Sequence, residues 1–169
     1  MITLRKAKEE DLPVIQQIGT ITYGPTYTPL IGQEQVDFML DKFYNIFALR
    51  QQLIDGHTFL IAQEEGKDLA FASYSIGDHD SVIKLHKLYV LPEAHGKGLG
   101  KLLINEVRNK AIEAGAKSLE LNVNRYNKAK DFYEKAGFKI KETVDIEIGN
   151  GFFMNDYVMA LALAPQDPA

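Results

Sequence analysis

The segment His95-Gly96-Lys97-Gly98-Leu99-Gly100 has the residue types and spacing needed to bind an anion. Its glycines follow a strand-like run that ends at Val90 and lead into a helix-like run that begins near Gly98. Glycine tolerates positive φ and lets backbone N–H groups approach a ligand, and the N-terminus of a helix adds unpaired donors and the positive end of its dipole. The segment therefore predicts a phosphate or pyrophosphate site. The simpler alternative is a tight strand-to-helix connection that binds nothing.

Two common phosphate-binding patterns fit this segment poorly. The Walker pattern needs four residues between its glycines, whereas Gly96 and Gly100 bracket three, and Leu102 stands where Ser or Thr should follow the lysine. The dinucleotide pattern needs an acidic residue at the end of the next strand, whereas Glu120 lies inside an apolar strand-like run. Its third glycine also falls one residue early in this chain.

A third pattern covers the chain from about residue 83 to residue 138. The segments that carry it are Leu88-Tyr89-Val90-Leu91-Pro92, the glycine loop, Asn127, Ala129 and Phe132-Tyr133-Glu134-Lys135-Ala136-Gly137-Phe138. Together they resemble the GNAT superfamily of N-acetyltransferases, whose cosubstrate is acetyl-CoA. The resemblance is specific because two separate motifs occur in the right order and spacing. It departs from the family at His95, where Arg or Gln is usual, so the positive charge there depends on pH.

The resemblance implies an α/β (α+β) fold with a mixed central sheet of about seven strands, a bulged fourth strand and about four or five helices. It also implies which residues contact acetyl-CoA. These are Leu88, Tyr89, Val90, His95, Gly96, Lys97, Gly98, Leu99, Gly100, Lys101, Asn127 and Tyr133. We expect at least one of the two loop lysines to reach the CoA phosphates, although a surface lysine is more often only solvated.

Composition is typical of an ordinary globular enzyme or binding domain. A chain of 169 residues with 46% hydrophobic content can bury one sizeable core, so we expect one domain over residues 1–163 and a flexible tail at residues 164–169. The net charge of −4 gives no reason to expect nucleic acid or an anionic membrane as partner. The absence of cysteine excludes disulfides and thiolate chemistry.

Targeting and membrane segments are also not expected. The first residues contain no apolar signal core, and no run approaches the roughly 20 residues of a membrane span. We expect a cytoplasmic protein without a metal. The sequence leaves a homodimer open.

Apolar periodicity predicts alternating helices and strands. Strands are expected at residues 2–6, 58–63, 69–75, a run ending at 90, 118–123, 138–148 and 152–163, with hairpin turns at 66–68 and 149–151. Helices are expected at 10–23, about 36–43, 46–55, from 98 and at 127–136. Pro25, Pro29 and Gly32 break the pattern, and the aromatic content of residues 23–27 favours a lid-like loop there.

The strand before the glycine loop contains a change of phase. Ile83 and Leu85 occupy odd positions, whereas Leu88 and Val90 occupy even ones, so the alternation slips around His86-Lys87. A β-bulge produces such a slip, and an irregular edge strand is the alternative. By resemblance, two strands separate here to admit the pantetheine arm, which would contact the backbones of Leu88 and Val90. An unpaired N–H there would polarise the thioester carbonyl.

Acetyl transfer to an amine needs a proton for the departing thiolate. Tyr133 stands where the family usually places the tyrosine that protonates the CoA sulfur, and a buried core tyrosine is its structural alternative. Asn127 would hydrogen-bond the cofactor arm or begin the following helix as its N-cap. For the proton that leaves the amine, His86 is the first candidate base, Glu120 the second, and water the third.

The acceptor is the least visible part of the reaction. The first helices and the last hairpin offer Tyr23, Tyr27, Asp145, Glu147 and Asp156, and carboxylates there would favour a polyamine or another primary amine, unless they face solvent. The function expected is therefore transfer of acetyl from acetyl-CoA to a primary amine of a small molecule or a peptide, by direct attack in a ternary complex. The alternative is a CoA-binding sensor or regulatory module that does not turn over.

Overall fold

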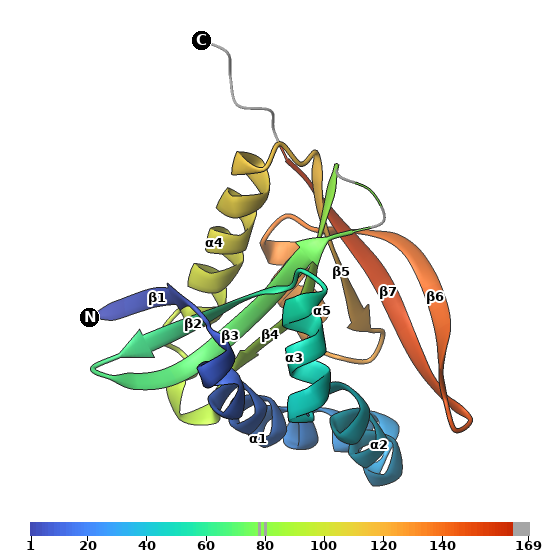
Figure 1. Cartoon of the computed structure of the whole chain (residues 1–169). Helices are drawn as coiled ribbons and strands as arrows, with labels where there is room; N and C mark the ends of the chain where they lie inside the picture. Colours follow the sequence, from blue (N-terminus) through green and yellow to red (C-terminus); the bar gives the residue numbers. More distant parts are fainter. Residues whose placement is uncertain (78, 80, 164–169) are drawn as a thin grey trace.

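Seven strands form one mixed sheet in the order β1-β2-β3-β4-β5-β7-β6 (Figure 1). They are β1 (Ile2–Lys6), β2 (Thr58–Glu64), β3 (Lys67–Ile76), β4 (Val82–Val90), β5 (Ser118–Asn124), β6 (Lys139–Gly149) and β7 (Phe152–Ala162). The pair β4–β5 is parallel and the other neighbours are antiparallel. The β2–β3 turn falls on Glu65-Gly66 instead of residues 66–68, because both residues adopt the positive φ of a two-residue hairpin turn.

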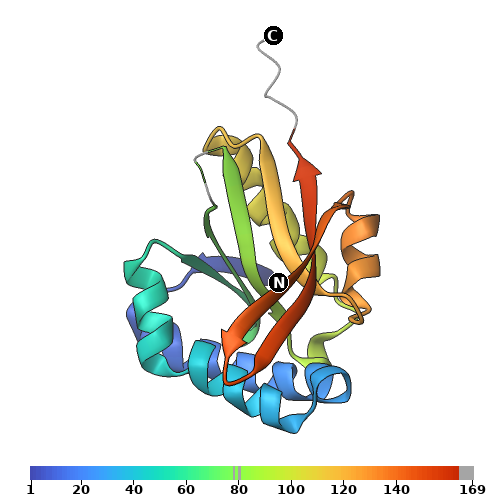
Figure 2. The same cartoon turned by 90° about the vertical axis from the view of Figure 1, so that its right-hand side faces the viewer.

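Helices cover both faces of the sheet in this computed structural model, which describes residues 1–77, 79 and 81–163. They are α1 (Leu12–Ile31), α2 (Gln33–Phe43), α3 (Ile46–Ile54), α4 (Leu99–Glu113) and α5 (Ala129–Lys135). The helices α1, α2 and α3 lie on one face and α4 lies on the other (Figure 2). This confirms the expected fold class. None of the helices in the described ranges is long and apolar enough to cross a membrane, and the expected tail at residues 164–169 lies outside those ranges.

Helix α1 is longer than the sequence predicts. The expected loop at residues 23–27 is wrong, because the helix continues through Gly24 and Pro25 to Ile31. Proline in a helix removes a hydrogen bond to the carbonyl four residues earlier. The carbonyls left free are those of Ile21 and Pro25, four residues before the two prolines. Ile21, Pro25 and Pro29 are all exposed, so water can bond these carbonyls. Tyr23 and Tyr27 are therefore held on a helix that packs over β3 and β4.

The bulge expected in β4 is confirmed at His86. Ser73 of β3 pairs with Lys87, but the next residue, Tyr74, pairs with Leu85, so His86 is the extra residue. The parallel pairing of β4 with β5 ends at Leu85↔Leu121. From that point β4 continues along β3 only, whereas β5 continues along β7. A wedge-shaped gap therefore opens between β4 and β5, and one edge of each strand lacks a neighbouring strand.

Helix α4 follows the glycine loop and packs against the sheet with one face. Leu99, Leu103, Ile104, Val107 and Ala111 are buried on it, in the three-and-four spacing of an amphipathic helix. The buried face fixes the helix axis, and with it the direction in which the first N–H groups of the helix point.

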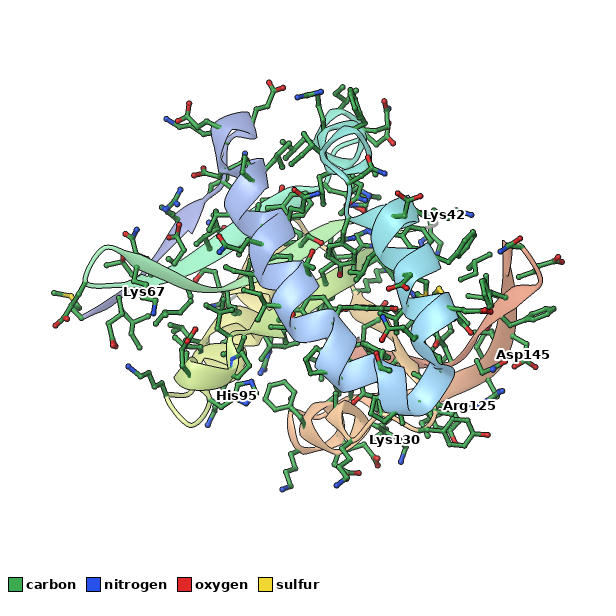
Figure 3. All side chains as sticks on the ribbon, turned by 90° about the horizontal axis from the view of Figure 1, so that it is seen from below. Lys42, Lys67, His95, Arg125, Lys130 and Asp145 are labelled. Atoms are coloured by element: carbon green, nitrogen blue, oxygen red, sulfur yellow. The ribbon has the colours of Figure 1, made fainter. Side chains whose placement is uncertain are left out.

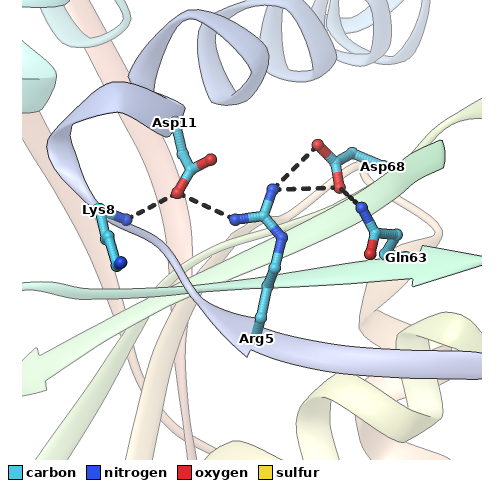
Figure 4. Close-up of polar contacts among 5 residues, drawn as sticks. All are labelled: Arg5, Lys8, Asp11, Gln63 and Asp68. Carbon is cyan, nitrogen blue, oxygen red and sulfur yellow. Dashed lines mark hydrogen bonds and ion pairs between the residues drawn. The ribbon is translucent and has the colours of Figure 1, made fainter. Parts of the chain in front are cut away.

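A cluster around Arg5 joins β1 to the start of α1 and to β3 (Figure 4). The Arg5 guanidinium contacts Asp11 at 3.0 Å and Asp68 at 3.1 Å. Asp11 also accepts a hydrogen bond from the Lys8 backbone N–H, and Asp68 accepts one from Gln63. Since Arg5 is only partly exposed and bridges two carboxylates, the cluster fixes the point at which the chain enters α1.

Close packing of α1 on Tyr44 gives a prediction about stability. A Cβ at Gly19 would lie 2.5 Å from a Tyr44 ring carbon, whereas one at Gly24 would meet nothing within 4 Å. We expect Gly19→Ala to lower the free energy of unfolding by about 1–3 kcal/mol. The matched Gly24→Ala should be neutral or stabilising by up to about 1 kcal/mol, because alanine favours helix. Urea unfolding of both variants is the measurement, and equal stabilities would contradict the packing.

Candidate active site

Two cavities meet at the gap between β4 and β5. The larger cavity has a volume of about 620 Å³ and extends from the gap to the glycine loop and α5. The smaller cavity has a volume of about 280 Å³ and lies among α1, α2, β4 and the ends of β5 and β7. Six residues line both cavities, which therefore adjoin at the bulge: Tyr27, Leu85, His86, Lys87, Tyr89 and Asn122. A molecule in one cavity can thus face a molecule in the other.

The glycine loop lines the far end of the larger cavity. Gly96 and Gly98 have φ values of 86° and 76°, and Gly98 is the N-cap of α4 without any side-chain cap. The N–H of Leu102 donates to the Gly98 carbonyl at 3.0 Å. The N–H groups of the helical residues before Leu102 have no carbonyl within the helix to bond. A row of backbone donors at a helix N-terminus fits a phosphate or pyrophosphate group.

The two loop lysines lie differently. Lys101 lines the larger cavity with Gly98, Leu99 and Gly100, but Lys97 does not. Lys97 forms an ion pair with Glu64 of β2 at 2.7 Å, which lowers the pKa of Glu64. Of the twelve residues expected to contact acetyl-CoA, the other eleven line this cavity.

His95 closes the end of β4 above the glycine loop. Its Nε2 lies 3.0 Å from the Val90 carbonyl oxygen, so in the tautomer that carries hydrogen on Nε2 it donates to that carbonyl. Figure 3 shows His95 on the side of the molecule that is remote from Arg125 and Asp145. His95 therefore supports the loop and also lines the larger cavity.

Tyr133 of α5 lines the larger cavity and is 9% exposed. Its ring meets those of Phe132 and Phe138 edge-on, at 5.3 and 5.8 Å. Burial raises the pKa of its hydroxyl, so the phenol stays protonated at neutral pH. Among the described residues no hydrogen bond holds this hydroxyl. A protonated, unbonded hydroxyl at a cavity wall can donate to a bound molecule.

Asn127 acts locally at the start of α5 and across to α1. Its Oδ1 accepts a hydrogen bond from the N–H of Ala129, and its Nδ2 donates to the Tyr27 hydroxyl at 3.0 Å. The first bond is an Asx-turn just before α5, whose N-cap is Lys128 and not Asn127 as the alternative from the sequence had it. The second joins residues 100 positions apart, and no local sequence signal could have predicted it.

His86 faces both cavities from the bulge, but its environment weakens it as a base. Its ring stacks on His57 at a centroid distance of 4.2 Å, and its Nε2 lies 2.6 Å from the Ser75 hydroxyl. Burial, with nearby His57 and Lys87, lowers the pKa of His86 well below its ordinary value. Glu120, the second candidate, lines neither cavity and is paired with Lys141 at 3.0 Å.

The smaller cavity has aromatic and thioether walls together with polar and charged side chains. Tyr23 stacks on Tyr27 at 4.4 Å, and Tyr89 hydrogen-bonds Tyr44. Of the five acceptor residues considered in the sequence, Tyr23, Tyr27 and the buried Asp156 line this cavity. Asp145 and Glu147 do not, and Asp145 of β6 is paired with Arg125, which follows β5 (Figure 3).

Lys87 is the main feature of the site that the sequence analysis did not identify. It lines both cavities, and its ammonium lies 5.1 Å from the centroid of the Tyr44 ring. In the described part of the chain no carboxylate pairs with it. Burial lowers the pKa of Lys87 to about 8. The phase slip at His86 was the available signal, because it turns Lys87 and Tyr89 to the face of β4 opposite Leu85.

Known proteins are similar to this chain in sequence and in fold. The family model described as acetyltransferase (GNAT) domain matches residues 27–161. An uncharacterized N-acetyltransferase of Mycobacterium bovis is 31% identical over 155 residues, which cover 90% of this chain and 98% of that protein. A spermidine N(1)-acetyltransferase of Thermoplasma acidophilum is 26% identical over 148 residues, which cover 84% of this chain and 91% of that protein.

The fold is shared with solved structures at lower identity. The PaiA N-acetyltransferase of Thermoplasma acidophilum, crystallised in complex with coenzyme A, matches with a TM-score of 0.80 and 24% identity. The match covers 96% of this chain and 99% of that one. The sheet order and the helix positions described above are therefore found in that protein as well.

The glycine loop gives a binding prediction. A Cβ at Gly100 would point into the larger cavity toward the Phe132 ring, 3.5 Å away, which is an ordinary contact. Gly100→Val should therefore fold, but its methyl groups should keep a phosphate from the helix N-terminus. We expect the dissociation constant for CoA to rise about 10-fold or more, with Gly100→Ala in between. Calorimetric titration measures this, and an unchanged affinity in the folded valine variant would contradict the placement.

Lys87 gives a stability prediction with a defined pH window. Replacing an unpaired, partly buried ammonium by a side chain of similar length, Lys87→Met, should raise the free energy of unfolding at pH 7 by on the order of 1–3 kcal/mol. The folded-state pKa of about 8 lies below the ordinary value of 10.5. Between these values the unfolded chain binds more protons, so wild-type stability rises with pH and the advantage of the variant fades. Unfolding at pH 7, 9 and 10.5 tests this, and a less stable variant at pH 7 would refute it.

Proposed function

The chain belongs to the GNAT family of acetyltransferases, and we propose that it transfers the acetyl group of acetyl-CoA to a primary amine of a small molecule or peptide by direct attack in a ternary complex. The observation that carries this proposal is the meeting of two cavities at the His86 bulge. The larger cavity has the anion-binding loop at one end and Tyr133 in its wall. The smaller cavity gives a second molecule access to the same gap.

The larger cavity suits acetyl-CoA. The N–H groups that begin α4, with Lys101 beside them, would bind the pyrophosphate. From His86 to Val90 the edge of β4 that faces the gap has no partner strand, so its backbone groups are available to the amides of the pantetheine arm. The PaiA protein, which shares this fold, was crystallised in complex with coenzyme A. This supports the proposal that the larger cavity binds acetyl-CoA.

In the reaction proposed, the amine nitrogen forms a bond to the acetyl carbon and the carbon–sulfur bond breaks. The sulfur leaves as a thiolate and takes a proton, for which Tyr133 is the donor. The proton that the attacking nitrogen loses as the amide forms then restores the Tyr133 phenol, directly or through water. The amine must lose a proton first, because an alkyl ammonium with a pKa of about 10.4 is almost fully protonated at pH 7. Lys84, which lines the smaller cavity, favours that loss, since a nearby positive charge lowers the pKa of an ammonium.

The groups that could take the amine proton differ in their strength as bases. His86 touches both cavities but has a lowered pKa. Asp156, buried in the smaller cavity, has a raised pKa because of its burial, which makes it a stronger base than an ordinary aspartate. We therefore assign proton removal to water in the smaller cavity, with His86 and Asp156 as hydrogen-bond acceptors.

Tyr133 separates an enzyme from a sensor that only binds CoA. Tyr133→Phe should lower kcat about 100-fold or more, because a positioned acid contributes roughly 10²–10⁴ in rate. The affinity for acetyl-CoA should change less than about threefold, since the ring remains. CoA release from a panel of amines, including spermidine, is the assay, with Tyr126→Phe at an exposed site as the control.

Two results would contradict the proposal in different ways. A Tyr133→Phe variant as fast as the wild type would remove Tyr133 from the mechanism. Binding of acetyl-CoA without acetylation of any amine would favour the sensor.

A further inference from the structure

The smaller cavity presents a positive charge to the molecule that enters it. Lys87 lines this cavity, and its described interactions include the Tyr44 ring but no carboxylate. Its cross-strand neighbour Ser73 is fully buried and has a hydroxyl without a partner, and Nδ1 of His57 is also buried without one. Lys87 is partly buried beside these groups, and a desolvated cation without a counterion is costly unless an anion joins it.

The charges of the cavity walls favour an acceptor that carries an anionic group. Lys84 and Lys87 contribute two ammonium groups, and Asp156 contributes one carboxyl. Lys84 donates to the side chain of Asn122, and the same Asn122 hydrogen-bonds Asp156. The Asp156 carboxyl on β7 therefore already has a hydrogen-bond partner, Asn122 of β5. A polyamine, whose remaining groups are all cationic, would meet Lys87 without compensation.

The remaining walls define the rest of the acceptor. Tyr23, Met39, Phe43, Tyr44 and Met154 provide aromatic and thioether surface, which suits an apolar or aromatic side group. The volume of about 280 Å³ is below the usual range for drug-sized ligands, which is roughly 300–1,000 Å³. Only a small molecule fits entirely within it.

We propose, on the premise of the acetyl transfer proposed above, that the acceptor is a small amino carboxylate with an apolar or aromatic side group, such as an α-amino acid, whose carboxylate pairs with Lys87 and whose amine faces the gap between β4 and β5. The carboxylate supplies the counterion that Lys87 lacks. The side group packs among the tyrosines and methionines. The products are the N-acetyl amino acid and CoA.

The test compares pairs of acceptors that differ only in the carboxylate. The full chain is assayed with acetyl-CoA and phenylalanine, leucine or methionine, each beside its primary carboxamide, and with spermidine. CoA release gives kcat/KM. In the wild type we expect each free acid to exceed its amide by about 10-fold or more, because a buried charge pair discriminates strongly against a neutral analogue. Spermidine should be the poorest acceptor.

Variants of Lys87 assign that preference to its charge. Lys87→Met should lower kcat/KM for the free acids about 10- to 100-fold and change that for the amides less than about threefold. Lys87→Arg should retain most of the preference, since it retains the charge. Lys110→Met removes a lysine of α4 that lines neither cavity, and should change nothing.

The outcomes distinguish this proposal from the one on which it rests. If spermidine or the amides are acetylated better than the free acids, or if Lys87→Met slows acids and amides equally, the amino carboxylate assignment is wrong and the acetyl transfer stands. If acetyl-CoA binds but no acceptor is acetylated, both proposals fail.

Discussion

The separation of β4 from β5 is the constraint on which the site depends. One extra residue, His86, shifts the register of β3 with β4, and parallel pairing with β5 ends at the adjacent Leu85. Backbone groups that a regular sheet would pair internally then face a cavity on each side. The bulge also changes which side chains share a face, so that Lys87 and Tyr89 point toward α1. A single irregularity thus provides the passage through the sheet and selects the side chains beside it.

The surrounding elements keep this gap open and give its two sides different chemistry. The buried face of α4 aims its N-terminal N–H groups at one end of the larger cavity, and Asn127 ties α5 to Tyr27 of α1. On this side the donors are backbone amides and the protonated hydroxyl of Tyr133. On the other side the groups are tyrosines, Asp156 and Lys87. We interpret the side with backbone amides as the one that binds a nucleotide with phosphates, and the other side as the one that binds a small acceptor.

Local patterns in the sequence were sufficient for most of the fold and for the side of the site that would bind the cofactor. Alternation and turn residues predicted the strands, the phase slip predicted the bulge, and the glycine loop with Tyr133 predicted the lining of the larger cavity. The end of α1 was predicted wrongly because proline usually breaks a helix. The longer helix is tolerated because Pro25 and Pro29 are exposed, so water can bond the carbonyls that lose a helical partner. The surroundings of Lys87 could not be predicted, because Ser73 and Tyr44 reach it only through tertiary packing.

The central claim is that coenzyme A lies along the gap, with its pyrophosphate at the start of α4 and its sulfur near Tyr133. A crystal structure of the chain with CoA tests this directly. The account predicts phosphate oxygens within hydrogen-bond distance of the N–H groups of residues 96–101, and the sulfur within reach of the Tyr133 hydroxyl. A pyrophosphate bound elsewhere, or a pantetheine arm that does not enter between β4 and β5, would contradict it.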